Sequence, residues 1–491
     1  MIQKILFFLL FASLSSLAAR PLPNVLWVVV EDQSKHYGFN GEALVQTPVL
    51  DKLCKDGVRF ANASVTAPVC STARSALITG MFQTSIGAHH HRSGRGQMKI
   101  QKPAHVKLIP ELFKKAGYYT CLGTIGHVTG TINPKHKSRL GKSDYNFEWD
   151  LSVFDAGEWS GRKKGQPFFA KICLSGGKAR SQARSSKEIP HVEASKVTLP
   201  PYYPRHPEVL EDWAAYLDTF SLMDKQVGQI VDRLKKEGEF ENTVLFFITD
   251  HGVSHARGKQ FCYDEGMMIP FFVHAPGRVK GGTVRKDPVL HIDLAATSLY
   301  FAGIEIPEYM EARPLFGPDA QARKFAVSAR DRCDETYDRI RAVRTQRFKY
   351  IRNGYPERPH LQPCAYKDNK STYLAIRDWG KKGKLNELQQ RLLLSPHRAP
   401  EELYDLKTDP WELKNLADDP EQSKTLLKMR KTLDQWIEET GDQGQKVEPM
   451  KMYDSDMKIY MDGQASRGRQ ERADEIQANV DQMKKWWEEG K

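Results

Sequence analysis

The stretch of sequence that decides the fold is PNVLWVVVED, residues 23–32. It contains six consecutive apolar residues, several of them β-branched, and it closes on Glu31 and Asp32. Strands buried on both faces of a parallel sheet have this composition, and open α/β sheets place their ligands at the carboxyl ends of such strands. The stretch therefore predicts a central strand that delivers two carboxylates to one edge of an α/β sheet.

A second stretch repeats this pattern later in the chain. ENTVLFFITDHG, residues 241–252, is again apolar and again closes on an acid, Asp250, which is followed by His251. Two strands that end in acidic residues at the same sheet edge predict a shared metal site.

The rest of the chain predicts helices around this sheet and a change of texture near residue 320. Helical spacing of apolar residues predicts a sheet-covering helix over 211–237, and 291–303 resembles a packing helix that ends at a glycine, while 268–276 reads as a further strand. After about residue 320 come short β-like runs such as RFKYIRN (347–353), charged loops and a terminal amphipathic helix. We therefore expect a catalytic domain over 19–320 and a smaller C-terminal α+β subdomain over 321–491.

The N-terminus has the features of a secretory signal. Residues 1–18 place Lys4 before an apolar run that ends in small residues, and no later stretch approaches the roughly 20 apolar residues of a membrane span. These features predict a secreted or periplasmic protein that does not stay in the membrane after the signal is removed. The seven cysteines are an odd number, so we expect at least one unpaired thiol in an exported chain.

The net charge favours an anionic partner. The formal charge is +12, and removing Lys4 with the signal leaves +11. A basic surface attracts polyanions such as sulfated polysaccharide or nucleic acid. The basic residues are scattered and form no nucleic-acid motif, so we do not expect nucleic acid as the partner.

The strongest local signal is APVCSTARSALITG, residues 67–80. Cys70 stands in a predicted turn just before helix-forming residues, and Arg74 follows four positions later. A helix N-terminus favours anions through its free N–H groups and its dipole. The stretch predicts a cysteine in an anion-binding position.

At this point the chain resembles the sulfatase family, whose signature is Cys-x-Pro/Ala-x-Arg followed by a run close to SxLTG. The resemblance covers nearly all of the mature chain, although Thr72 stands where Pro or Ala is usual. It implies an α/β fold like that of alkaline phosphatase, with a central mixed sheet flanked by helices. It also implies that a sulfatase-maturing enzyme oxidises Cys70 to formylglycine, whose hydrate attacks sulfur and then expels sulfate by collapsing to the aldehyde.

The resemblance also implies a calcium ion, since four residues match the family's ligands position by position. They are Glu31, Asp32, Asp250 and His251. Calcium takes several oxygen ligands at flexible geometry, and three carboxylates supply them. Glu31 replaces the usual first Asp, and His251 stands where Asn is commoner.

Cations complete the site that the resemblance implies. Lys259 in SHARGKQF and Lys142 in LGKSDYNF match the family's sulfate-contacting lysines, so with Arg74 and Cys70 they form the predicted catalytic set. Further residues are expected to contact anionic substrate or line the pocket: His91 in the block His89-His90-His91-Arg92, His127, Lys178 and Arg180. His127 and His255 are candidates for protonating the departing oxygen, and the sequence does not choose between them.

The favoured reading is a sulfuric-ester hydrolase that acts on a sulfated carbohydrate. The segments GGKAR, RGKQF and LGKSDYNF look most like the branch that includes heparan N-sulfatase-like and related bacterial proteins, so O-sulfate and N-sulfate both stay open. One alternative is a phosphoester hydrolase of the same superfamily. The other is a catalytically degenerate relative that binds sulfated glycans.

Overall fold

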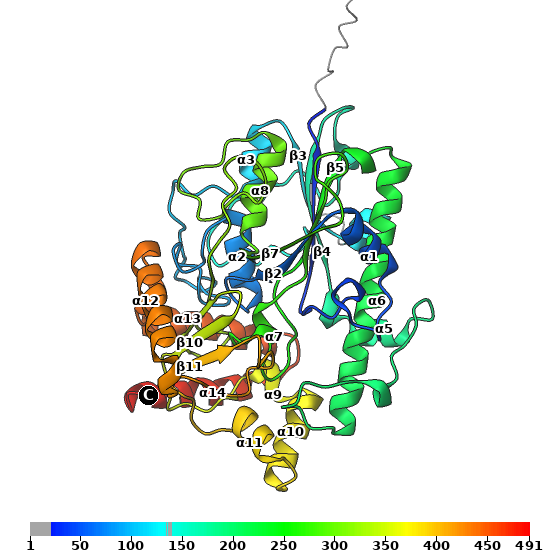
Figure 1. The fold of residues 1–491 in the computed structure, drawn as a ribbon. Helices are drawn as coiled ribbons and strands as arrows, with labels where there is room; N and C mark the ends of the chain where they lie inside the picture. The colour runs from blue at the N-terminus through cyan, green and yellow to red at the C-terminus, as the bar shows by residue number, and fades with distance from the viewer. Residues whose placement is uncertain (1–20, 134, 136–139) are drawn as a thin grey trace, which may run out of the picture.

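The computed structural model describes residues 21–133, 135 and 140–491, and it shows a layered α/β protein with a second, smaller sheet (Figure 1). The predicted signal segment 1–18 lies outside the described residues. Within the described part of the chain, no helix is long and apolar enough to cross a bilayer.

The central sheet has seven strands in the order β3-β4-β1-β5-β6-β2-β7. All neighbours pair in parallel except β6, which is antiparallel to both β5 and β2, so the sheet is mixed. The strands are β1 (Asn24–Val30), β2 (Val58–Ser64), β3 (Tyr119–Thr124), β4 (Phe168–Leu174), β5 (Thr243–Thr249), β6 (Phe271–His274) and β7 (Thr283–Leu290). The two strands predicted from their apolar runs are β1 and β5, and they are neighbours in the sheet.

Alternate side chains of β1 enter separate cores on the two faces of this sheet. Val25 and Trp27 pack into one apolar cluster, whereas Leu26 and Val28 pack into the other. Because every residue of β1 is buried, its sequence is continuously apolar and does not alternate. Figure 1 shows helices on both faces of the sheet. They are α1 (Pro48–Asp56), α2 (Cys70–Thr79), α3 (Ile109–Lys115), α4 (Ile125–Thr129), α5 (Arg180–Ser185), α6 (Pro207–Lys236), α7 (Asp264–Met267) and α8 (Asp293–Ala302).

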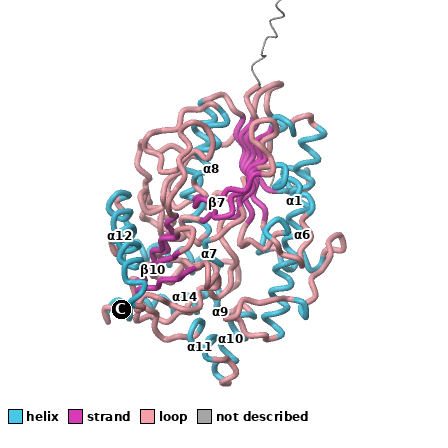
Figure 2. The backbone as a smooth tube through the Cα atoms, viewed as in Figure 1, coloured by secondary structure: helices cyan, strands magenta, loops and turns pink. Residues whose placement is uncertain are grey.

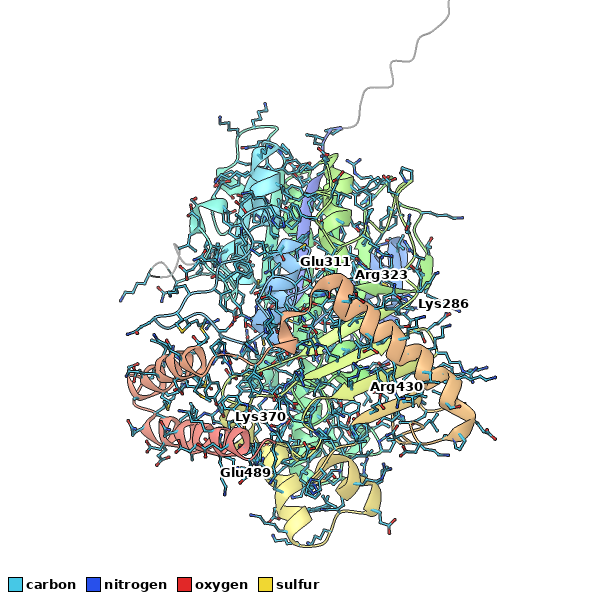
Figure 3. All side chains as sticks on the ribbon, turned by 90° about the vertical axis from the view of Figure 1, so that its left-hand side faces the viewer. Lys286, Glu311, Arg323, Lys370, Arg430 and Glu489 are labelled. Carbon is cyan, nitrogen blue, oxygen red and sulfur yellow. The ribbon has the colours of Figure 1, made fainter. Side chains whose placement is uncertain are left out.

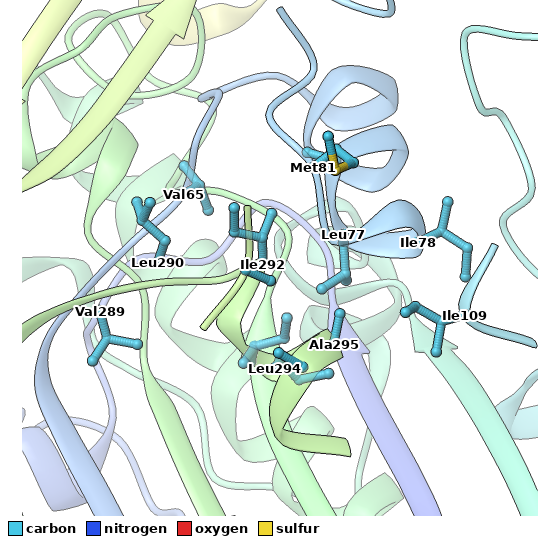
Figure 4. Packing of buried hydrophobic residues seen from close by; sticks show 14 of the residues in the cluster. Val65, Leu77, Ile78, Met81, Ile109, Val289, Leu290, Ile292, Leu294 and Ala295 are labelled. Carbon is cyan, nitrogen blue, oxygen red and sulfur yellow. The ribbon is translucent and has the colours of Figure 1, made fainter. Parts of the chain in front are cut away.

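Helix α2, which begins at Cys70, is fixed by the core. Leu77, Ile78 and the following Met81 belong to the same buried cluster as Ile292 and Leu294, which lie at the start of α8 (Figure 4). Every residue of α2 is buried. Since closely packed interiors resist displacement, the position of Cys70 at the head of the helix is rigid.

The smaller sheet is antiparallel, with the order β11-β10-β9-β8, and Figure 2 shows it apart from the central sheet. Its strands are β8 (Ala326–Arg330), β9 (Ile340–Arg344), β10 (Phe348–Asn353) and β11 (Glu401–Asp405). The helices that accompany it are α9 (Ala365–Asp368), α10 (Ser371–Lys381), α11 (Glu387–Leu393), α12 (Ser423–Thr440), α13 (Met450–Ala465) and α14 (Gln470–Glu488). The predicted fold class, a mixed α/β sheet with a C-terminal α+β subdomain, is confirmed.

Most of the predicted elements agree with the structure, and the differences are small. The helix expected over 211–237 is α6, the strand expected over 268–276 shortens to β6, and the helix expected over 291–303 is α8. One terminal helix was expected, whereas α13 and α14 form a pair of packed helices. Residues of both sheets share one apolar cluster, so the predicted boundary at residue 320 does not separate two cores.

Candidate active site

The carboxyl ends of adjacent parallel strands bring the three acids together. Val30 of β1 is in register with Thr249 of β5 and with Leu174 of β4. Glu31 and Asp32 therefore emerge beside Asp250, whose side chain accepts a hydrogen bond of 3.1 Å from the Asp32 amide. The acids identified at the ends of the two strands lie at one sheet edge because these strands are adjacent and parallel.

Cys70 occupies the first position of α2 and faces this acidic edge. Its Sγ lies 2.8 Å from Nζ of Lys259, 3.1 Å from Nε2 of His251 and 3.8 Å from both Nζ of Lys178 and Oδ1 of Asp32. The thiol is 4% exposed and therefore reacts only with a group that enters the cavity. Three cationic groups and a helix N-terminus converge on one sulfur atom.

These neighbours shift the pKa values of Cys70 and His251. Burial alone would raise the pKa of the Cys70 thiol, but Lys178, Lys259 and His251 bring it down to about 6. Burial opposes a charged imidazole, yet Asp250, Cys70 and Asp32 together raise the pKa of His251 to about 10. The arrangement thus stabilises negative charge at the position of the Cys70 side chain.

Arg74 joins the Cys70 segment to the acids and is almost fully buried. Its NH1 donates to Asp250 at 2.6 Å, and its Nε and NH2 donate to the two oxygens of Asp144 at 2.8 and 2.9 Å. Burial disfavours the ionised Asp144 carboxylate, but Arg74 holds the pKa of that group below its usual range. Asp144 thereby orients Arg74.

The carboxylates suit a hard cation, and His251 adds one imidazole nitrogen to the donor set. One ligand atom from each of Asp32, Cys70, Asp250 and His251 lies within 4.8 Å of the others. Nδ1 of His251 lies 2.7 Å from the Gly252 carbonyl oxygen, which leaves Nε2 directed at the carboxylates. Metal-binding histidines are commonly oriented in this way, and carboxylate oxygens suit Ca²⁺. The donor set therefore fits a cation beside Cys70.

Glu31 differs from the other three predicted ligands, since its carboxylate is engaged by cations. It forms ion pairs with Lys178, with Lys142 at 3.6 Å and with Arg74 at 3.7 Å. A Cβ on Gly177 would lie 2.2 Å from the Asp32 carbonyl oxygen, so the close approach of the GGK segment to this edge requires glycine. That approach brings Lys178 to both acids of the pair.

These groups open into a cavity of about 460 Å³. Seven of its thirteen lining residues are lysine or arginine and three are aspartate, so the cavity is suited to an anion. The lining residues are Asp32, Cys70, Arg74, His91, Arg92, Lys142, Asp144, Lys178, Arg180, Lys259, Asp334, Tyr366 and Lys370.

Of four further predicted residues, two line the cavity and two lie outside its lining. His91 and Arg180 line the cavity. Among the described residues, neither His127 nor His255 belongs to its lining. Nδ1 of His127 accepts from the Thr124 amide at the start of α4, and Nε2 of His255 lies 2.7 Å from Asp212. The geometry gives no support to either histidine as the proton donor or, for His127, as a substrate contact.

Two cavity residues near α9, Tyr366 and Lys370, were not predicted from the sequence. The Tyr366 hydroxyl lies 3.5 Å from Oδ2 of Asp32, and its ring centroid is 4.7 Å from Nζ of Lys259. Nζ of Lys370 donates to the Ser254 hydroxyl at 2.7 Å, and burial with nearby Arg180 lowers the pKa of Lys370 to about 7. Both residues come from the C-terminal subdomain and follow no motif, so only the tertiary structure reveals them.

Fold and site together define a hydrolase-like α/β protein with a buried thiol, an acidic cation site and an anion-binding cavity. The family model "Sulfatase" matches residues 23–304, and "N-sulphoglucosamine sulphohydrolase, C-terminal" matches residues 251–358. The chain belongs to the sulfatase family and is a sulfatase.

Relatives and solved structures agree with this assignment. The chain is 32% identical to an "Ulvan-active sulfatase" of Formosa agariphila, over 86% of this chain and 75% of that protein. It is 26% identical to the human "N-sulphoglucosamine sulphohydrolase", over 86% of this chain and 91% of the relative. A solved "2-O GAG sulfatase" superimposes with a TM-score of 0.61 at 19% identity, over 88% of this chain and 96% of that structure, which shows the shared fold.

Proposed function

We propose that this sulfatase releases sulfate from a sulfated carbohydrate, with formylglycine derived from Cys70 as nucleophile and Ca²⁺ as the bound ion. The observation that carries the proposal is the convergence of Lys259 and Lys178 on the Cys70 side chain at the head of α2. Such a position stabilises a developing anion in a buried cavity. The proposed catalytic unit is residues 19–320, with 321–491 completing the cavity.

The protein positions the group that Cys70 becomes. Formylglycine supplies, as its hydrate, a hydroxyl that attacks sulfur and an aldehyde whose re-formation releases sulfate. Helix α2 fixes that group through its buried packing, and the burial of Cys70 excludes bulk water from it. Formation of the aldehyde requires a sulfatase-maturing enzyme as a partner.

The acidic edge is the proposed calcium site. Asp32, Asp250 and His251 would hold the ion, with Glu31 at its margin beside Lys178. A bound Ca²⁺ would polarise a sulfate oxygen and offset charge in the transition state. His251 keeps Nε2 directed at the site through its Nδ1 contact with the Gly252 carbonyl oxygen.

The cations of the cavity are proposed to bind the sulfate ester. Lys259 and Lys178 are closest to the reacting position, whereas Lys142 has a half-exposed side chain and meets Glu31. A sulfate ester carries one negative charge, and ammonium groups in a desolvated cavity bind it strongly. Lys259, Lys178 and Lys370 are also the ammonium donors from which the departing oxygen can take a proton.

The substrate class rests on the relatives and on the charge of the chain. The proteins at 32% and 26% identity are named for ulvan and for N-sulphoglucosamine. The basic cavity and the net charge of +12 suit a sulfated polysaccharide or its fragments. Residues 1–18 support export to the periplasm or beyond, where such glycans are met.

The first test is the intact mass of the Cys70 peptide from protein produced with a sulfatase-maturing enzyme. Conversion of the thiol to the aldehyde lowers the mass by about 18 Da, and sulfate release from sulfated glycans should appear with it. Cys70→Ala should abolish release while the protein stays folded. A thiol that persists under every maturing enzyme, with retained glycan binding, would replace the enzyme reading with the binding-protein alternative.

A further inference from the structure

A second and larger cavity adjoins the one that contains Cys70. Its volume is about 870 Å³, and it shares Arg92, Asp334 and Tyr366 with the Cys70 cavity. Its other wall is formed by α13, α14 and the turn between them. We call this second cavity the hairpin groove. Figure 3 shows these two helices side by side along one flank of the molecule.

Five arginines line the hairpin groove, and three of them are unpaired. Arg92 is held 3.2 Å from Asp334, and Arg472 is held 3.4 Å from Glu475. In the part of the chain that the structure describes, the side chains of Arg95, Arg467 and Arg469 form no ion pair and no hydrogen bond. Guanidinium groups of this kind are donors for the oxygens of sulfate or carboxylate groups.

Arg95 faces this groove without a directly bonded counter-ion. It is only partly exposed, and burial lowers its pKa; Arg92 adds to that effect, while Asp144, Asp334 and Asp456 oppose it from a distance. Partial burial of a charged group without a directly bonded counter-ion is unfavourable, and an anion in the groove would reduce that cost.

Three acids line the groove, Asp334, Asp456 and Glu471, and one of them, Asp456, holds the loop and the hairpin together. Asp456 of α13 accepts hydrogen bonds from the Gly94 and Arg95 amides at 3.1 and 3.0 Å and from Arg332 at 2.9 Å. Asp456 is 3% exposed, so it does not offset the three unpaired arginines by direct contact. The loop that carries Arg92 and Arg95 is thereby fixed against α13, which leads into the turn that carries Arg467 and Arg469.

We propose that the hairpin groove binds a second anionic group, sulfate or carboxylate, on a sugar farther along the polysaccharide whose sulfate ester sits at Cys70. Tyr460 lines the groove beside this position, and its ring centroid lies 5.1 Å from Cζ of Arg92, which packs over one ring face. This inference rests on the proposed function and extends it. It predicts that the enzyme prefers oligosaccharides or polysaccharides with several anionic groups over sulfated monosaccharides.

The test uses the double variant Arg467→Ala/Arg469→Ala in full-length protein. Both residues are exposed in the turn around Gly468, so their removal takes no packing from the core. The control is Lys424→Ala/Lys428→Ala, which removes two exposed charges from α12, away from the groove. Binding of ulvan and heparin oligosaccharides is measured by calorimetry in the Cys70→Ala background, where catalysis plays no part.

The proposal expects the arginine double variant to weaken oligosaccharide binding about tenfold, which corresponds to ~1.4 kcal/mol, with a smaller effect at high salt. In enzyme that carries formylglycine, the arginine double variant should also lower the ratio of kcat/KM for an oligosaccharide to kcat/KM for a sulfated monosaccharide by about tenfold. The lysine control should match the parent in both measurements.

The two proposals fail in different ways. If wild type releases no sulfate but oligosaccharide binding still depends on the two arginines, the proposed function is refuted and the proposed anion site in the groove is retained. Sulfate release with equal behaviour of the arginine and lysine variants would overturn the groove, and so would failure of the parent to bind either oligosaccharide.

Discussion

Replacing Lys259 with methionine tests the anion-stabilising role of the Cys70 cavity most directly. The Lys259 side chain is 4% exposed, and its Nζ lies 2.8 Å from Cys70 Sγ and 3.4 Å from Asp32 Oδ1. Two unit charges at such distances interact by about 5–6 kcal/mol at an effective dielectric constant of about 20, which is an upper bound for the loss. Removing one preorganised donor to a developing oxyanion costs about 10²–10³ in kcat, or about 2.7–4 kcal/mol. We therefore expect kcat/KM for sulfate release to fall by about 10²–10³.

The fold should survive this change. Asp32 keeps His251 at 3.1 Å and Lys178 at 3.7 Å, so it is not left as an isolated buried charge. The melting temperature, measured by circular dichroism, separates loss of catalysis from loss of folding.

Lys142→Met is the matched comparison, since it removes the same charge from the same cavity. The Lys142 side chain is 49% exposed and pairs with Glu31 at 3.6 Å. Exposed ion pairs contribute about 0–1 kcal/mol, so we expect less than about a tenfold loss. Equal losses of kcat/KM in the two variants would indicate that the lysines act through the overall positive charge of the cavity and not through a direct contact of Lys259 with the reacting group. A Lys259→Met enzyme that stays within tenfold of wild type and melts normally would refute the reasoning.

Three further predictions concern the cation, the hairpin and pH. Chelation by EGTA should slow sulfate release, with calcium restoring it better than zinc; rescue by zinc alone would favour phosphoester-type chemistry. Arg332→Met leaves Glu448 and Asp456 buried without their cation, so urea titration should show a loss of about 3–5 kcal/mol, and a loss below about 1 kcal/mol would contradict this. Burial lowers the pKa of Lys367 from 10.5 to about 7. The unfolded chain therefore binds more protons between these values, and the stability of wild type relative to Lys367→Met should rise by about 2 kcal/mol from pH 7 to pH 9 in urea titrations; a flat difference would argue against a neutral Lys367.

The central sheet was predictable because its strands carry their own signal. β1 and β5 are buried on both faces, which forces continuous apolar runs, and their parallel register makes the acids at their ends neighbours. The start of α2 was predictable too, since Cys70 opens a helix that ends at Gly80 with a left-handed φ of 68°. These features are local in sequence or follow from strand pairing alone.

The parts that the sequence did not predict depend on long-range packing. Tyr366 and Lys370 reach the cavity only because the C-terminal subdomain folds back over the sheet edge. His127 and His255 looked suitable by residue type, but one caps α4 and the other pairs with Asp212. A histidine gives the same sequence signal in a cap, a buried ion pair or an active site, so position alone separates these roles.

Backbone strain at the site is a further property that residue types did not indicate. Asp32, Arg92 and Asp334 line the cavity with φ values of 53°, 60° and 54°, and Gln260, next to Lys259, has a φ of 77°. Left-handed conformations cost non-glycine residues about 1–3 kcal/mol each and persist only where surrounding contacts impose them.

The contacts that impose this strain lead to the Cys70 segment. The Gln260 amide donates to the Pro68 carbonyl oxygen at 2.8 Å, and the Arg92 amide faces the Ser71 hydroxyl at 3.3 Å. The residues flanking Cys70 therefore hold two strained loops that carry cations into the cavity. Because α2 is packed into the core along its whole length, the packing that fixes Cys70 also offsets the strain. Cys70 and the anion-binding groups are therefore preorganised as one unit.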